Sequence, residues 1–184
     1  MKEETILWRR LDRPGHEAAR LVFHAPLWQL TGTAVFSEEG QPCRLEYRVV
    51  CDSLWHTLHA QVDGWHGSRR TKCEVRVDSH RGWYLNDQPR PAVEGSTDLD
   101  LAFSPATNLL AIRRMALGLG SSASVRAAWL TFPALTLEPL EQAYRRTGPT
   151  TYRYEAPGHG FAADLEVNAA GFIVRYPGLW EEEA

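Results

Sequence analysis

The chain has 184 residues, of which 43% are hydrophobic and 23% are charged. This length predicts one domain with its own core, and the composition lies far from that of chains too polar to fold. The formal net charge of −3 provides no basic field of the kind that nucleic-acid binding requires, so we expect no nucleic-acid partner.

The amino-terminal segment and the cysteines indicate where the protein is expected to reside. No apolar run near residue 1 resembles a secretory signal, and no stretch approaches the roughly 20 apolar residues of a membrane span. Cys43, Cys51 and Cys73 are odd in number and lack the spacing of a zinc site or a disulfide framework. We therefore expect a cytoplasmic protein with no transmembrane segment, no metal and no other cofactor.

Alternation of apolar and polar residues dominates the chain and predicts β-strands. In residues 45–51, apolar side chains alternate with Glu46 and Arg48, which is typical of a strand with one solvent-facing side. The predicted strands are 6–11, 18–24, 32–37, 45–51, 55–62, 73–77, 124–132, 150–155, 161–167 and 172–176. Turn signals containing glycine separate several of them, so the expected fold is all-β, with a curved antiparallel sheet forming a barrel, roll or sandwich.

One segment departs from this pattern and predicts a single short helix. After Ser104 and Pro105, apolar residues recur at three-residue spacing at Leu109, Ile112 and Met115. Ser104 or Thr107 is the expected cap. Residues 1–184 are expected to form a single domain, with the acidic residues 181–184 as a frayed tail.

Two acidic residues are the strongest candidates for chemistry. Asp98 and Asp100 lie two positions apart and would share one face of an extended segment, as a carboxylate pair for acid–base work requires. The alternative is structural, with ion pairs to Arg113 or Arg114. Arg113 or Arg114 is also a candidate for gripping the phosphate or carboxylate of a head group. The chain has no nucleotide-binding loop or nucleophile elbow, and we assign no catalytic residue.

Aromatic residues are numerous, with seven Trp, six Tyr and six Phe. Trp65 lies in a turn signal and Trp83 follows another, and such rings can line the mouth of a barrel where they suit sugars or lipid head groups. The alternative is that they fill an ordinary core. Tyr152 and Tyr154 share one face of a predicted strand and allow the same two interpretations.

The segment Asp98–Arg114, DLDLAFSPATNLLAIRR, resembles the signature of a bacterial family named putative glycolipid-binding. Further matches follow the same order at residues 52–55, 82–86, 140–144, 152–154 and 171–180. The chain departs from the family pattern at Leu109, Ala111 and Asp87. The resemblance implies a spiral β-roll, which is a strongly curved antiparallel sheet around a hydrophobic interior. It also implies similarity to bacterial lipoprotein carriers, and it supplies no catalytic residues.

These observations together predict a protein that holds a glycolipid or another long-chain amphiphile in the apolar interior of a curled sheet, without catalysis. The residues expected near the cavity or its rim are Trp55, Trp83, Asn86, Asp98, Asp100, Asn108, Arg113, Tyr152 and Tyr154. One alternative is an enzyme acting on a small amphiphile, with Asp98 or Asp100 as base and Arg113 as anion clamp. Another is a structural domain whose aromatic residues pack a dry core.

Overall fold

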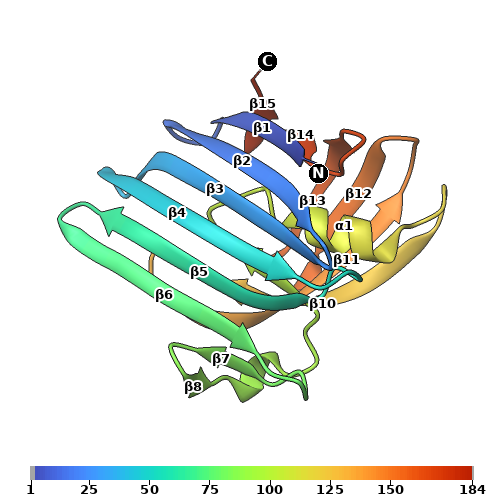
Figure 1. The fold of residues 1–184 in the computed structure, drawn as a ribbon. Coiled ribbons are helices and arrows are strands. Elements are labelled where there is room, and N and C mark those ends of the chain that lie inside the picture. Colours follow the sequence, from blue (N-terminus) through green and yellow to red (C-terminus); the bar gives the residue numbers. More distant parts are fainter. Residues whose placement is uncertain (1–2, 184) are drawn as a thin grey trace.

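The computed structural model describes residues 3–183, which are almost entirely strands (Figure 1). The first half contains β1 (Glu3–Arg10), β2 (Gly15–His24), β3 (Leu27–Glu38), β4 (Gln41–Cys51), β5 (Thr57–His66), β6 (Arg69–Val77), β7 (Trp83–Leu85) and β8 (Gln88–Pro89). The second half contains β9 (Asp98–Leu101), α1 (Asn108–Met115), β10 (Ser122–Leu130), β11 (Leu137–Arg146), β12 (Thr151–Ala156), β13 (Phe161–Val167), β14 (Ile173–Tyr176) and β15 (Trp180–Glu182). Single 3-10 turns occupy Pro91–Val93 and Pro157–His159.

All fifteen strands belong to one sheet, in the order β8-β7-β6-β5-β4-β3-β2-β1-β15-β14-β13-β12-β11-β10-β9. Neighbouring strands are antiparallel except β9, which runs parallel to β10. The chain therefore builds one meander from β1 to β8, crosses to β9, and builds a second meander that returns to β1. The two halves join where β1 pairs with β15, at Trp8 and Glu182. The sheet is not closed, because β8 and β9 are its two outer strands.

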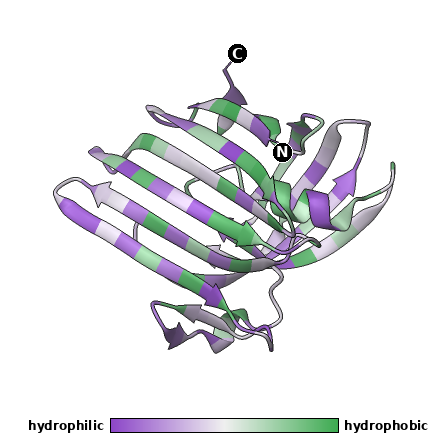
Figure 2. Ribbon diagram, viewed as in Figure 1, coloured by the Kyte–Doolittle hydropathy of each residue, from purple (hydrophilic) through white to green (hydrophobic). Residues whose placement is uncertain are grey.

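The alternating pattern explains why the predicted strands form. Along β4, Cys43, Leu45, Tyr47 and Val49 are buried while the residues between them are exposed. Figure 2 shows the same alternation along β4, β5 and β6. The all-β class and the ten predicted strands are confirmed, with boundaries that differ by a few residues. All three cysteines are buried and unpaired.

The helix is where the sequence predicts it, and of the two expected caps Thr107 holds the N-cap position. α1 starts at Asn108, and before it residues 101–104 form a turn in which the Ser104 N–H donates to the Leu101 carbonyl. Thr107 occupies the N-cap position, but its hydroxyl accepts a hydrogen bond from the Leu101 N–H rather than capping the helix. α1 is the single α-helix within residues 3–183, and it is too short and too polar to cross a membrane.

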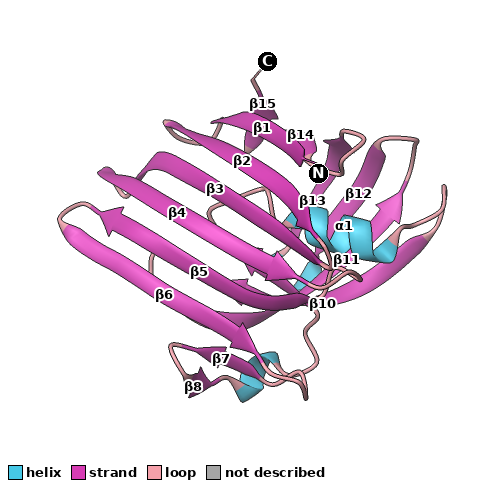
Figure 3. Ribbon diagram, in the orientation of Figure 1, coloured by secondary structure: helices cyan, strands magenta, loops and turns pink. Residues whose placement is uncertain are grey.

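The helix, drawn in cyan in Figure 3, contacts both halves of the sheet. Leu109 and Leu110 are fully buried. Arg113 lies 5.3 Å from the Trp55 ring in the first half, and Asn108 donates a hydrogen bond to Tyr144 in the second half. At this point the protein's own helix therefore occupies the expected apolar cavity. Burial of its apolar residues on both sides stabilises this short helix.

Contacts outside the strand ladders also connect the two halves. The Thr57 hydroxyl in β5 accepts a hydrogen bond from the Leu99 N–H in β9 at 3.0 Å, although the two strands are far apart in the sheet order. The Ser104 hydroxyl donates to the buried carboxylate of Glu17 in β2. The strand pairing shows one open sheet, and the strong curvature of a spiral β-roll stays a prediction.

The carboxyl end corrects one expectation. Glu181 and Glu182 belong to β15 and pair with Arg9 and Trp8 in β1, so they are not a frayed tail. The Glu183 N–H donates to the Leu7 carbonyl at 2.8 Å, and Ala184 lies outside the described residues. These backbone partners come from the other end of the chain, which an acidic composition alone does not indicate.

Candidate functional site

The nine residues predicted to surround a ligand do not form one site. Asp100, Asn108 and Tyr154 line one cleft, which we call the Asp100 cleft. Arg113 and Tyr152 line a second, which we call the Arg113 cleft. Because Asn108 opens α1 and Arg113 lies in its last turn, the two clefts lie at opposite ends of the helix. Trp55, Trp83, Asn86 and Asp98 line neither cleft.

The Asp100 cleft combines aromatic walls with a few polar groups in about 300 Å³. Its aromatic residues are Trp129, Tyr154, Phe161, Tyr176 and Trp180, and its polar side chains include Asp100, Ser104, Asn108 and His159. Three of the rings form a cluster with centroids 6.0 to 6.2 Å apart. An aromatic concavity with few, convergent polar groups is typical of sites for small organic ligands.

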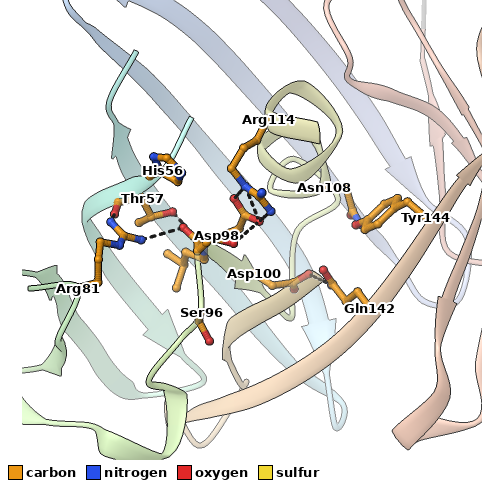
Figure 4. Close-up of polar contacts among 12 residues, drawn as sticks. His56, Thr57, Arg81, Ser96, Asp98, Asp100, Asn108, Arg114, Gln142 and Tyr144 are labelled. Carbon is orange, nitrogen blue, oxygen red and sulfur yellow. Dashed lines mark hydrogen bonds and ion pairs between the residues drawn. The ribbon is translucent and has the colours of Figure 1, made fainter. Parts of the chain in front are cut away.

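Hydrogen bonds hold the polar groups of this cleft in place (Figure 4). The amide of Gln142 donates to Asp100 Oδ2 at 2.8 Å and to the Tyr154 hydroxyl at 3.1 Å. Asn108 Nδ2 donates to the Tyr144 hydroxyl at 2.9 Å. Asp100 Oδ1 accepts no hydrogen bond from the side chains of residues 3–183, so it remains available as an acceptor at the cleft.

The carboxyl group of Asp100 has a pKa above the usual value for an aspartate. Burial disfavours the charged form and raises its pKa to about 6, although the hydrogen bond from Gln142 acts in the opposite direction. The negative charge of Asp98 contributes to the same upward shift of the pKa. Asp100 therefore changes its charge close to neutral pH.

Asp98 plays a structural part rather than forming a carboxylate pair for chemistry. Arg114 Nε donates to Asp98 Oδ1 at 2.9 Å and Arg114 Nη2 donates to Asp98 Oδ2 at 2.6 Å (Figure 4). The Asp98 side chain is only 3% exposed. Asp98 thus ties β9 to α1, whereas Asp100 binds Gln142 of β11. Neither aspartate lies with Arg113 as the predicted base and anion clamp would require, because Asp98 is bound by Arg114, while Asp100 and Arg113 line different clefts.

Two other predicted residues lie away from both clefts. Trp83 is buried and its Nε1 donates to the Ser96 carbonyl at 3.1 Å, so it packs the core beneath β7. Asn86 is exposed in the turn between β7 and β8, where its positive φ of 50° is one that asparagine tolerates well. Its Oδ1 accepts from the Glu74 N–H at 2.9 Å, which is a turn-stabilising contact.

Trp55 belongs to an aromatic stack near the Arg113 cleft. Its ring is stacked on Trp28 with centroids 4.3 Å apart, and Trp28 in turn contacts Phe23 at 4.7 Å. The Arg113 guanidinium lies 5.3 Å from the Trp55 ring centroid. Trp55 does not line the Arg113 cleft, but its ring helps to position the Arg113 guanidinium.

Possible metal ligands do not gather in the described part of the chain. Residues 3–183 contain no group of three or more His, Cys, Asp or Glu side chains arranged to hold an ion. His56 contacts Asp52 and His59 contacts Glu74, each as a separate pair.

Comparison with known proteins assigns the family. The family described as putative glycolipid-binding matches residues 5–182. The chain belongs to this family. It is also similar to a DUF1089 family protein from Pseudomonas aeruginosa whose crystal structure is known, with 32% identity, a TM-score of 0.81 and 91% of each chain covered. No curated protein matches the chain.

Membership of the putative glycolipid-binding family confirms the resemblance seen in Asp98–Arg114, and the structure shows what that segment does. Asp98 binds Arg114, Ser104 binds Glu17, and Asn108 binds Tyr144. These contacts fix α1 against both halves of the sheet. The same segment supplies Asp100, Ser104 and Asn108 to the Asp100 cleft.

Sequence reasoning missed several residues that line the cleft, and it also missed Gln142, which binds two of the lining residues and could have been found from its position. Gln142 lies between Leu140 and Tyr144 at period-2 spacing, and all three are buried along β11. A polar residue on the apolar face of a strand indicates a buried hydrogen-bonding group. Trp129 and Trp180 carried no such signal, because nothing in their local sequence distinguishes a cleft from a core.

Proposed function

We propose that this protein binds the head group of a glycolipid, or of another sugar-bearing amphiphile, in the Asp100 cleft and performs no catalysis there. The observation that carries the proposal is the convergence of Asp100 Oδ1 and the Asn108 amide with aromatic rings in one cleft. Family membership supports it, since the family is described as putative glycolipid-binding.

The chemistry of a sugar ring suits these walls. Aromatic rings pack against the apolar C–H faces of a sugar, while a tryptophan N–H remains available as a hydrogen-bond donor. Trp129 and Trp180 line the cleft, and their indole N–H groups donate to no acceptor within residues 3–183. The Asp100 carboxylate accepts hydrogen bonds from sugar hydroxyls, and charge-assisted bonds of this kind are the stronger ones.

The size of the cleft bears on how much of the amphiphile it holds. A volume of about 300 Å³ lies at the lower end of the range for ligand pockets. It therefore suits a head group and the first part of an acyl chain, with Leu140, Ala156 and Leu179 as apolar neighbours. Each methylene that leaves water contributes about 0.8 kcal/mol, so even a short buried segment adds affinity.

The spiral-roll curvature is part of this proposal. It is supported by the contact of Thr57 with Leu99, which joins β5 to β9, and by that of Ser104 with Glu17, which joins the segment after β9 to β2. Residues of β12, β14 and β15 line the cleft at the start of α1, an arrangement that a roll of this kind would produce. The cytoplasmic location stays a prediction.

The lining of the cleft argues for binding rather than hydrolysis. Glycosidases use a pair of carboxyl groups on either side of the scissile bond. Within residues 3–183, Asp100 is the one carboxylate that lines this cleft, and the nearby Asp98 is bound to Arg114. A single acid with its pKa near 6 can exchange a proton, but it has no partner carboxylate here.

Titration with alkyl glycosides tests the proposal, together with native mass spectrometry of freshly purified protein for co-purified lipid. We expect Trp129→Ala to weaken glycoside binding about tenfold or more, the usual effect of removing a central aromatic contact. Trp65→Ala is the matched control, since Trp65 lies on β5 and lines neither cleft. Equal affinity of both variants and the unaltered protein, or no glycoside binding at all, would overturn the proposal.

A further inference from the structure

The Arg113 cleft differs from the Asp100 cleft in its charge. It encloses about 290 Å³ at the carboxyl end of α1, next to β12 and the turn before β14. Two arginines line it, Arg113 and Arg146, and none of its lining residues is acidic. The Asp100 cleft, in contrast, is lined by an aspartate and by no arginine or lysine.

Each nitrogen of the Arg146 guanidinium already donates one hydrogen bond. Its Nε, Nη1 and Nη2 donate to the carbonyls of Gly148, Leu117 and Pro149, with Nη1 at 2.9 Å and Nη2 at 2.6 Å. The guanidinium thus holds the surrounding loops together. It contributes positive charge to the cleft, but no nitrogen that lacks a partner.

Arg113 differs from Arg146 because its guanidinium is held next to an aromatic ring but has no hydrogen-bond or ion-pair partner within residues 3–183. It makes no hydrogen bond and no ion pair with any of residues 3–183. The Trp55 ring lies 5.3 Å from its guanidinium, and its aliphatic stem packs on Gly171. A Cβ at Gly171, where φ is +96°, would stand 3.1 Å from Arg113 Cδ. Glycine at this position therefore leaves room for the arginine stem.

Other donors at the cleft also lack acceptors. Asn168 Oδ1 accepts from the N–H groups of Ala170 and Phe172, and the NH₂ group of Asn168 donates to no acceptor within residues 3–183. The hydroxyls of Thr150 and Tyr152 make no side-chain hydrogen bond with residues 3–183. A guanidinium, an amide NH₂ and two hydroxyls with no carboxylate among them complement an oxyanion.

We propose that the Arg113 cleft is a binding site for a phosphate or carboxylate group, separate from the sugar site. Arg113 grips the anion through its planar fork, and the amide and hydroxyl donors complete the contacts. The competing explanation is that Arg113 only complements the negative end of the helix. Arg114 occupies the same last turn, but its charge is neutralised by Asp98, so the two arginines have different roles.

An NMR titration that follows the side-chain Nε–H signal of Arg113 tests this assignment. The probes are inorganic phosphate, hexyl phosphate and hexyl glucoside. We expect saturable shifts at Arg113 and Asn168 with a phosphate probe, and no such shift at Arg113 with the neutral glucoside. Tighter binding of hexyl phosphate identifies the anion as a lipid head group, whereas equal binding of both phosphates identifies a free anion. Absence of a saturable shift with either phosphate, or an equal shift with the glucoside, would overturn the proposal.

Variants separate this site from the helix-end explanation. Arg113→Gln is expected to weaken phosphate binding about 10- to 100-fold, the equivalent of one or two charge-assisted hydrogen bonds. Arg145→Gln removes the same charge from the exposed face of β11 and should change affinity by less than about threefold. If Arg113→Gln lowers the melting temperature but leaves phosphate affinity unchanged, the residue serves the helix alone.

The two sites are tested independently of each other. Glucoside binding that survives Arg113→Gln shows that the Asp100 cleft works without this one. Phosphate binding that survives Trp129→Ala shows the converse.

Discussion

The ion pair between Asp98 and Arg114 should be among the costliest contacts to break. Arg114→Met would deprive the Asp98 carboxylate, which is only 3% exposed, of three charge-assisted hydrogen bonds of 2.9, 3.2 and 2.6 Å. The Thr97 hydroxyl at 3.1 Å would be its remaining side-chain partner. An uncompensated buried charge costs about 3 to 5 kcal/mol, which lowers the melting temperature of a protein of this size by roughly 6 to 20 °C.

Urea unfolding followed by circular dichroism measures this loss. Arg175→Met is the matched control, because Arg175 and Glu166 form a surface pair at 3.2 Å with exposed side chains of 59% and 46%. Such a pair contributes under about 1 kcal/mol. If Arg114→Met also costs less than about 1 kcal/mol, the view of Asp98 as the link between β9 and α1 is wrong.

Three further predictions concern buried groups. Burial raises the pKa of Glu17 to about 7. Because the unfolded chain ionises this group from about pH 4.5, the free energy of unfolding falls by about 3 kcal/mol as pH rises from 4.5 through 7. In urea melts, the stability of Glu17→Gln relative to the unaltered protein should increase by about that much between pH 5 and 8. Glycoside affinity should fall as Asp100 protonates below pH about 6, and a binding curve for Asp100→Asn that kept this pH dependence would contradict the role of its carboxylate. Gly64→Ala would place a Cβ 1.9 Å from the Arg44 carbonyl oxygen and should cost about 1 to 3 kcal/mol, whereas Gly158→Ala, with open space around it, should be neutral.

Strands with one buried face were predictable because their signal is local. Along residues 43–49 the side chains alternate strictly, and no distant contact is needed to identify a strand. β9 was seen only as an extended segment, and β15 was mistaken for a tail. Both are short, and each is defined by its partner strand, β10 or β1, rather than by its own pattern.

The candidate site was predictable only in part, for a similar reason. Asp100, Asn108 and Tyr154 were identified and do line one cleft. Their spacing in the sequence does not reveal that Arg113 lies at the other end of the helix, or that Asp98 is committed to Arg114. Which side chains share a cavity depends on how the two halves of the sheet meet, and that is a property of long-range packing.

A crystal structure of the protein with a bound alkyl glycoside tests the central claim most directly. The account predicts a sugar ring against Trp129, with a hydroxyl within hydrogen-bond distance of Asp100 Oδ1. A sugar bound at saturating glycoside elsewhere on the protein, with the Asp100 cleft holding only water, would contradict it.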